Sequence, residues 1–369
     1  MREVTLADRA ERFRDDVAAV LGRAVTAVDV LAIAVSGGPD SMALLALAHA
    51  AWPGQVIAAT VDHGVRAGSA DEAAMVAGWC ATLPHQVGRP EGISHDILRP
   101  AKPLGAANVQ AAARAARYAL LTDWAIAHGA TMLATAHHAD DQAETFLMRA
   151  ARGSGLAGLS GIRPKRDIAT HRPHDGYPRG GVVAVYDTWT IPLIRPLLGW
   201  RRGELRALVD AAGVPFVDDP SNADERYDRT RFRRLLAENE TLDPVGLAQT
   251  AGYAREGHEA LDAMIRWLWQ DRKVARPDIE DCDYQTWLNL AGLPREIERR
   301  LAREAIDGVR DVNGITRPAF SSATNIEPLL EAVEAGTAAT QGGILVSRDG
   351  DVWHFREAPA RRNTLPPQS

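Results

Sequence analysis

The sequence predicts an α/β protein with a parallel doubly wound sheet, followed by a helical C-terminal region and a small terminal β-hairpin. In the first half, short unbroken apolar runs alternate with segments of helical length. This pattern is typical of parallel strands whose two faces are both covered by helices. Near the C-terminus, two alternating segments flank Asp349-Gly350, a dipeptide that favours a hairpin turn.

The elements predicted in the first half follow one another in regular order. Four apolar runs are predicted to be strands: residues 28–35, 55–61, 131–136 and the short run 85–87. Helices are predicted at residues 6–21, 41–51, 69–81, 105–128 and 140–152. Ser69 is a suitable N-cap for the third of these helices. The strands and helices together predict a sheet covered on both faces.

The middle and C-terminal parts are less regular. Residues 165–181 mix His, Pro, Arg and Gly without a period and are predicted to form an exposed loop. Residues 182–188 and 191–196 are predicted to add a strand or an edge hairpin. Further helices are predicted at 201–212, 245–271, 294–308 and 326–335, and the hairpin at 343–348 and 351–356. We therefore expect domains at residues 1–240, 241–320 and 321–357, with a disordered proline-rich tail at 358–369.

Composition narrows the class of protein. The net charge of −6 argues against a protein that binds nucleic acid with its whole surface, although a local basic face is compatible with it. Cys80 and Cys282 are far apart and form no C-x-x-C motif, so neither a zinc knuckle nor a thioredoxin-like pair is expected. The N-terminus lacks a secretory signal and no apolar run is long enough to span a membrane. We expect a cytoplasmic protein.

The most informative motif is Ser36-Gly37-Gly38-Pro39-Asp40-Ser41, between a predicted strand and a predicted helix. Its glycines allow the backbone to approach an anion closely, and the helix N-terminus favours negative charge. The two serine hydroxyls can donate hydrogen bonds to phosphate oxygens, and Pro39 suits the first helical turn. The carboxylate of Asp40 would repel phosphates unless a cation lay between them, which predicts a shared Mg²⁺.

This loop lacks the Gly-Lys-Ser/Thr of a Walker A motif and resembles the PP-loop of N-type ATP pyrophosphatases. Other segments are similar to those of tRNA(Ile)-lysidine synthetases, most closely over residues 28–236. They are residues 61–66 (VDHGVR), 108–110 (NVQ), 113–118 (ARAARY), 137–145 (HHADDQAET), 152–159 (RGSGLAGL), 195–198 (RPLL), 219–222 (DPSN) and 227–231 (YDRTR).

The resemblance implies a fold similar to the adenine nucleotide alpha hydrolases and an ATP-dependent ligase activity. Such enzymes adenylate the C2 oxygen of the wobble cytidine in tRNA(Ile) with a CAU anticodon. Free L-lysine then attacks C2, and AMP leaves after the earlier loss of pyrophosphate. On this view residues 1–240 are the catalytic domain and residues 241–320 a helical tRNA-binding domain.

Several charged residues suit that chemistry. Asp141 and Glu144 are three positions apart on one predicted helix and face the same way, so they can bind the lysine ammonium, accept its proton or hold Mg²⁺. Asp140 points elsewhere and is a weaker candidate. Arg117 is the first candidate to bind the α-phosphate or the lysine carboxylate, and Arg114 the second.

Further contacts are expected around these groups. Asp62 and His63 follow the second strand, where the resemblance implies the nucleotide lies, although His63 can equally cap a loop. His137 and His138 can orient the carboxylates or pack as ordinary core histidines. Basic segments 149–166 and 226–234 are expected to contact RNA phosphates, with Arg152, Arg195, Arg229 and Arg231 as substrate-binding residues. Trp267, Trp269 and Trp353 can stack on bases but suit a packed core better.

Other classes of enzyme explain less of the sequence. A tRNA thiolation enzyme would share the loop but needs reactive cysteines, which this chain does not offer in suitable positions. A metal-dependent phosphohydrolase would use Asp62, His63, His137, His138, Asp140 and Asp141 as ligands but leaves the loop unexplained. An inactive tRNA-binding module is disfavoured because every expected catalytic residue is present. A glutamine-dependent synthetase would need an amidotransferase segment, and none is visible.

Overall fold

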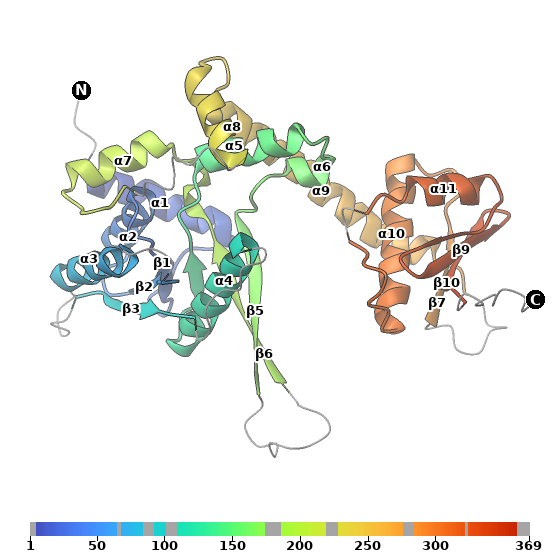
Figure 1. Cartoon of the computed structure of the whole chain (residues 1–369), viewed down its shortest axis with the longest axis horizontal. Coiled ribbons are helices and arrows are strands. Elements are labelled where there is room, and N and C mark those ends of the chain that lie inside the picture. The colour runs from blue at the N-terminus through green and yellow to red at the C-terminus, as the bar shows by residue number, and fades with distance from the viewer. Residues whose placement is uncertain are drawn as a thin grey trace, which may run out of the picture. The chain divides into compact units, whose positions relative to one another are not determined.

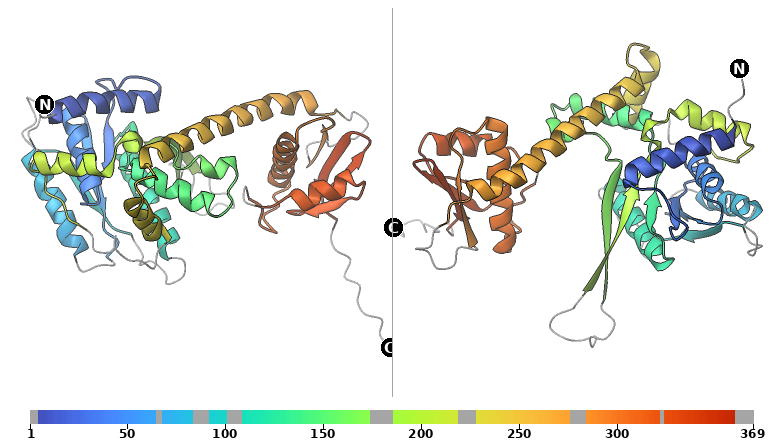
Figure 2. Two further views of the ribbon diagram at one scale, coloured as in Figure 1. Left: turned by 90° about the horizontal axis from the view of Figure 1, so that it is seen from above. Right: turned by 180° about the vertical axis from the view of Figure 1, so that it is seen from behind.

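The computed structural model describes residues 5–64, 68–83, 92–100, 109–173, 186–218, 228–275, 284–321 and 324–359. The chain divides into two compact units, Met1–Glu256 and Gly257–Ser369 (Figures 1 and 2). The predicted strand at 85–87, residues 105–108 of the predicted long helix and most of the predicted tail lie outside the described residues. The domain boundaries at residues 240 and 320 stay predictions.

The first unit is built on a six-stranded sheet in the order β3-β2-β1-β4-β6-β5. The central strands are β1 (Leu31–Ala34), β2 (Val56–Val61) and β4 (Met132–Ala134), with β3 (Ser94–Leu98) at one edge. These four strands and β6 (Tyr186–Ile194) are mutually parallel, while β5 (Lys165–Pro173) pairs antiparallel to β6. The predicted parallel α/β sheet is thus confirmed, with one antiparallel strand at its edge.

Helices cover both faces of this sheet, because successive strand residues point to opposite sides. Leu31 and Ile33 of β1 pack into a core with α1 (Leu6–Leu21), α2 (Pro39–Ala51), α3 (Ser69–Thr82) and α7 (Arg202–Ala211). Ala32 of the same strand packs into a second core with α4 (Val109–Ala127). The remaining helical segments of this unit are α5 (Ala139–Ala150), α6 (Leu156–Leu159), the 3₁₀ turn η1 (Pro196–Gly199) and α8 (Asp228–Glu238).

The second unit combines helices with a four-stranded antiparallel sheet in the order β7-β10-β9-β8. The predicted hairpin is confirmed as β9 (Ile344–Asp349) and β10 (Val352–Glu357), with Gly350 at φ +59° in the turn. Two strands that the sequence did not reveal, β7 (Gln285–Asn289) and β8 (Ala339–Gln341), extend it. Helices α10 (Arg295–Val312) and α11 (Glu327–Glu334) pack on the sheet. The long helix α9 (Pro244–Arg272) begins in the first unit and ends in the second.

Two local predictions were wrong. The supposed loop at 165–181 contains β5, which forms a long ribbon with β6 (Figure 1). This edge strand has polar residues on its exposed face, and only Ile168 packs against the core of α4, so it shows no apolar run. Ser69 is not an N-cap: Gly68 takes that position, and the Ser69 hydroxyl donates to Asp62 at 2.7 Å.

The predicted tryptophans divide between core and surface. Trp353 is buried in the terminal sheet, and Trp269 packs against the same core. Trp267 is 68% exposed, so it has no packing role of this kind. Among the described residues, no helix combines the length and apolarity needed to cross a bilayer.

The entry to β1 depends on a buried carboxylate. Asp29 is 3% exposed and accepts two hydrogen bonds from the Arg23 guanidinium, both at 2.8 Å, and two more from the backbone and hydroxyl of Thr26. The hydrogen bonds from Arg23 hold the pKa of Asp29 well below its usual range. The contribution of Asp29 to the free energy of unfolding is therefore complete above the pKa of about 4 that its carboxyl group has in the unfolded chain. It is lost as the pH falls below that value.

We predict that Asp29→Asn lowers the free energy of unfolding by about 2 kcal/mol at neutral pH, because charge-assisted hydrogen bonds are lost. Denaturant titration followed by circular dichroism measures this. Asp15→Asn, at an exposed position of α1, is the matched control and should change stability by less than about 0.5 kcal/mol. Equal stabilities of the two variants would contradict the assignment.

Candidate active site

The loop predicted to bind nucleotide lies between β1 and α2, as expected. Gly38 is the N-cap of α2 and Pro39 its first residue. Gly37 has φ +84°, a conformation that favours glycine, and its carbonyl accepts a hydrogen bond from the backbone of Val217 at 2.9 Å. The hydroxyl of Ser41 accepts from the Ser36 backbone at 3.1 Å and donates to the Gly38 carbonyl at 2.9 Å. These bonds fix the loop with the N-terminus of α2 open to a ligand.

A cavity of about 650 Å³ opens at this loop. Its lining comes from the carboxyl end of the sheet and from α4, α5, α7 and α8. It contains six arginines, Arg114, Arg117, Arg202, Arg206, Arg229 and Arg233, and four carboxylates, Asp40, Glu72, Asp141 and Asp218. A cavity of this size holds a nucleotide, and its excess of cations suits anionic groups.

The structure brings many of the predicted residues together around the cavity. Those that line it are Ser36, Gly38, Pro39, Asp40, Ser41, Arg114, Arg117, His137, Asp141 and Arg229. Those that do not are Gly37, Asp62, His63, His138, Asp140, Glu144, Arg152, Arg195 and Arg231. The second group includes residues that hold the lining in place, described below.

Asp40 projects from the first turn of α2. One carboxylate oxygen lies 3.4 Å from Nε2 of His138. The other oxygen, Oδ1, is buried without a hydrogen-bond partner in the protein. An unsatisfied buried carboxylate oxygen beside an open helix N-terminus suits a cation brought in with a ligand.

His138 links Asp40 to the carboxylates of α5. It is the N-cap of that helix, is 1% exposed, and its Nδ1 accepts from the Asp141 backbone at 3.4 Å. Burial alone would favour the neutral ring. The hydrogen bond to Asp40 and the charges of Asp141 and Asp40 outweigh it and raise the pKa of His138. His138 therefore lies between these two carboxylates and links them.

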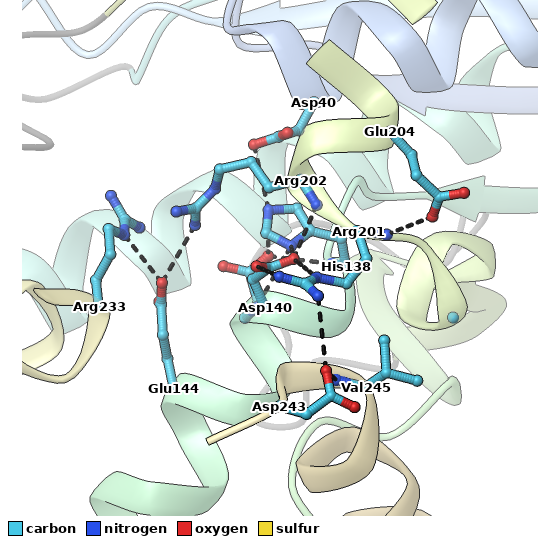
Figure 3. Close-up of polar contacts among 12 residues, drawn as sticks. Asp40, His138, Asp140, Glu144, Arg201, Arg202, Glu204, Arg233, Asp243 and Val245 are labelled. Carbon is cyan, nitrogen blue, oxygen red and sulfur yellow. Dashed lines mark hydrogen bonds and ion pairs between the residues drawn. The ribbon is translucent and has the colours of Figure 1, made fainter. Parts of the chain in front are cut away.

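Glu144 is the most enclosed carboxylate of the site. Its side chain is 1% exposed and accepts hydrogen bonds from Arg202 at 3.2 Å, Arg229 at 2.8 Å and Arg233 at 2.9 Å. Figure 3 shows Arg202 and Arg233 converging on it. With three cations bound, Glu144 positions arginines instead of facing a substrate. Its predicted role in lysine transfer stays a prediction.

Asp141 has one face toward the cavity. It accepts from Arg229 at 2.7 Å and from the His138 backbone at 3.1 Å. Burial acts to raise the pKa of Asp141, but the charges of His138 and Arg229 outweigh it and lower it. Because Arg229 bonds both Asp141 and Glu144, the two carboxylates do share one face of α5, as their spacing suggested.

Asp140 points away from the cavity. It accepts from the Arg202 backbone at 2.8 Å and from the Arg201 side chain at 3.3 Å (Figure 3). Arg201 also lies 3.7 Å from Asp243, which accepts from the backbone of Val245 at the start of α9. Asp140 thus holds the start of α7, consistent with its being the weaker catalytic candidate.

The two other predicted nucleotide contacts have different surroundings. Asp62 is buried and accepts from Gly64, Ser69 and Arg99, so its oxygens are engaged in holding their own loop. Both ring nitrogens of His63 are buried without a partner. Desolvation and the charge of Arg117 lower the pKa of His63, which favours its neutral ring.

His137 lines the cavity as a neutral side chain. Its Nδ1 lies 3.0 Å from the hydroxyl of Thr135. Burial lowers the pKa of His137 to about 3. The charge of Asp141 opposes this shift, and the charges of Arg195 and Arg114 add to it. The ring can therefore exchange hydrogen bonds with a substrate without adding charge.

The remaining predicted arginines are spread out. Arg195 is 3% exposed and donates to the Arg163 carbonyl at 2.6 Å. Arg152 and Arg231 are exposed, away from the cavity lining. Sequence reasoning missed Arg202, Arg206 and Arg233, which do line it. Arg233 lies two positions after the predicted Arg231 in the basic segment 226–234, so that segment could have indicated it. Nothing in the sequence at the start of α7 indicated that Arg202 and Arg206 line the cavity.

Cys80 bears on the thiolation alternative. It is a free cysteine buried in α3, and burial raises the pKa of its thiol to about 12. A thiol in this state is unreactive. Cys282 lies outside the described residues. Among the residues described, no group of three or more His, Cys, Asp or Glu side chains is arranged to hold a metal ion.

Comparison with known proteins identifies the class that this fold and site define. Residues 10–240 match the PP-loop domain family, so the chain belongs to the PP-loop proteins. More particularly, it belongs to the tRNA(Ile)-lysidine synthases, an ATP-dependent ligase family. It is 39% identical to the tRNA(Ile)-lysidine synthase of Novosphingobium aromaticivorans over 98% of both chains. It is 38% identical to that of Zymomonas mobilis, over 91% of this chain and 90% of the relative.

We predict that Glu144→Gln lowers the free energy of unfolding by about 2–4 kcal/mol, because three arginines lose their buried counter-charge. Chemical denaturation measures the change. The matched control is Glu238→Gln on α8, whose exposed carboxylate lies 3.7 Å from Arg234. This control should cost less than about 1 kcal/mol. A loss no larger than that of the control would refute the role given to Glu144.

A second prediction concerns pH. Since the folded pKa of His137 lies near 3 and the unfolded one near 6.5, the unfolded chain binds a proton that the native ring does not. Stability should therefore fall as the pH drops below about 6.5. In His137→Asn this component should be absent, so the stability difference between wild type and variant should shrink with acidification between pH 8 and 5. A difference that is constant over this range would argue against a neutral buried ring.

Proposed function

We propose that this protein adenylates the C2 oxygen of the wobble cytidine in tRNA(Ile) with a CAU anticodon, then joins free L-lysine to C2. The observation that carries the proposal is the cavity in which the loop from Ser36 to Ser41 faces Arg117 and Asp141. Family membership supports the same activity. The products would be lysidine in the tRNA, AMP and pyrophosphate.

ATP binding is supported by the loop and the cavity. The open N-terminus of α2 and the glycine backbone suit the phosphates, and Arg114 and Arg117 supply positive charge from α4. Neither arginine has an ion-pair partner among the described residues. Both are therefore available to an incoming phosphate.

The residues present fit a shared Mg²⁺. The unpartnered Oδ1 of Asp40 can be one oxygen ligand, and the phosphates and water would supply the others. When bound, the ion would offset phosphate charge during cleavage of the α–β bond. His138 holds the second oxygen of Asp40 and so fixes the carboxylate direction.

In the first step, the cytidine C2 oxygen bonds to the α-phosphorus and the bond to pyrophosphate breaks. The work of this protein is to align the two groups and to stabilise charge on the phosphates. Arg117 lies on the wall of the cavity, where its positive charge can stabilise the phosphates, and Arg114 lies one turn away on the same helix. Adenylation converts the C2 oxygen, a poor leaving group, into part of AMP.

In the second step, the lysine amine bonds to C2 and the C2–O bond to AMP breaks. Free lysine carries an ammonium group with a pKa of about 10.4, so a proton must first leave. Asp141 faces the cavity, and its lowered pKa favours the anion, which suits it to bind the ammonium. Its place beside the bound amine makes it the proposed acceptor of the proton. Glu144 and Arg229 keep Asp141 in place.

The second unit is proposed to assist in binding the tRNA outside the anticodon. It presents Trp267, which is 68% exposed, and an aromatic side chain of this kind can stack on a base.

We predict that Asp40→Asn reduces adenylation by about 100-fold or more, because the shared cation site is lost. Pyrophosphate release in the presence of tRNA(Ile) measures the step. Asp71→Asn, an exposed change in α3, is the control and should retain wild-type rates. Thermal unfolding checks that both variants are folded. Full activity in Asp40→Asn would remove this residue from the reaction.

The proposal as a whole is tested with purified protein, ATP, Mg²⁺, labelled lysine and tRNA(Ile) bearing the CAU anticodon. Acid-stable label on the RNA, dependent on every component, is expected together with AMP and pyrophosphate. Elongator methionine tRNA, which shares that anticodon, tests selectivity. Pyrophosphate without label would indicate a different nucleophile. If neither product forms while a related enzyme in the same assay forms both, the proposal is wrong.

A further inference from the structure

A cluster of three arginines surrounds Tyr118 on α4. The guanidinium carbon of Arg114 lies over the Tyr118 ring, 5.2 Å from its centroid, and that of Arg166, from β5, lies over it at 4.8 Å. Arg195, at the end of β6, is close enough for its charge and those of Arg166 and Arg114 to oppose one another. Two sheet strands and one helix thus bring three cations to one aromatic side chain.

This cluster has no counter-charge in the described part of the chain. None of the three arginines is paired there with a carboxylate, in contrast to Arg202, Arg229 and Arg233. Arg195 is 97% buried, since its exposure is 3%, yet its Nε has no hydrogen-bond partner. Burial lowers the pKa of Arg195; its interaction with Tyr118 opposes this shift, and the charges of Arg166 and Arg114 add to it. An anion bound to the exposed guanidinium groups of Arg114 and Arg166 would relieve the repulsion among the three cations.

The position of the cluster indicates which anion this is. Arg114 and Tyr118 line the cavity, whereas Arg166 is exposed outside the lining and Arg195 is buried. The cluster thus extends from the cavity to the protein surface at Arg166. ATP and lysine are expected to react inside, between the loop of Ser36 and Asp141. The RNA is the one substrate that must continue outside once its reacting base has entered. Each of its nucleotides carries a phosphate, for which the planar guanidinium is a suitable partner.

We propose that Arg114 and Arg166, held over Tyr118 with the buried charge of Arg195 behind them, bind one backbone phosphate of the anticodon loop next to the nucleotide being modified. This inference rests on the proposed function and adds Arg166 and Tyr118 to the substrate-binding residues. Phosphate binding at this point fixes the position of the RNA relative to the cavity. It carries no sequence information of its own.

Arg166 allows a sharp test, because it is exposed and lies outside the cavity lining. Its neighbour Lys165 is the matched control. Arg166 pairs with Leu193, which faces the α4 core, while Lys165 pairs with Ile194, which faces the other core. The two side chains therefore carry the same charge on opposite faces of one strand.

The experiment compares the wild type, Arg166→Gln, Arg166→Lys and Lys165→Gln in the lysine-transfer assay and in tRNA binding at several salt concentrations. Arg166→Gln should raise the KM for tRNA about tenfold and leave the KM for ATP and lysine within about twofold. It should also reduce the slope of log affinity against log salt by about 0.7, the value for one phosphate contact in a single strand. Arg166→Lys should recover part of the loss, and Lys165→Gln should raise the KM by less than about twofold.

Three outcomes would overturn the inference in an active enzyme. They are an unchanged tRNA KM and salt slope in Arg166→Gln, an equal effect of Lys165→Gln, or a rise in the KM for lysine or ATP instead. Thermal unfolding of each variant excludes a folding defect. A wild-type enzyme that transfers no lysine to tRNA would instead refute the proposed function, so the two failures are distinguishable.

Discussion

The arrangement of the active site depends on one buried carboxylate. Glu144 binds Arg202 of α7 and both Arg229 and Arg233 of α8, and so brings three helices to one point. A buried carboxylate is tolerated because its charge is fully paired, and removal of the charge would leave three cations facing one another. The same three arginines form part of the cavity wall. The position of that wall is therefore an electrostatic consequence of Glu144.

A second set of contacts places the reactive groups. His138 begins α5 and lies between Asp40 of the loop and Asp141 of its own helix. Its hydrogen bond to Asp40 and the charges of Asp141 and Asp40 raise its pKa against the effect of burial. Asp40 of the loop and Asp141 of α5 therefore lie beside the same histidine at the cavity wall. The excess of arginines in the cavity lining suits the anionic substrates, ATP and RNA.

Much of the fold could be predicted from the sequence, because buried parallel strands are short apolar runs. β1, β2 and β4 are of this kind. The loop that follows β1 was predicted from its glycine-rich motif instead. β3 and β5 lie at the edges of the sheet and were missed, since an edge strand such as β3, Ser94–Leu98, keeps polar residues. Edge pairing depends on the neighbouring strand, and the segment alone does not reveal it.

The candidate site shows the same division. Asp40, Arg117 and Asp141 were predicted from local motifs, and all three line the cavity. The partners of Glu144 are 58, 85 and 89 residues away in the chain, so spacing could not show that it is enclosed by arginines. Without those partners Glu144 resembles a second catalytic carboxylate. The fold turns it into a support for Asp141 and for the cavity wall.

The account requires the RNA to be adenylated before lysine reacts, and this can be measured directly. The protein is incubated with tRNA(Ile), Mg²⁺ and ATP labelled in the adenine, without lysine, and the RNA is isolated. We predict covalently bound AMP on the tRNA with an equal amount of pyrophosphate, and release of that AMP when lysine is added. Lysine transfer that proceeds while no labelled AMP can be trapped on the RNA, even in a rapid quench, would contradict the account.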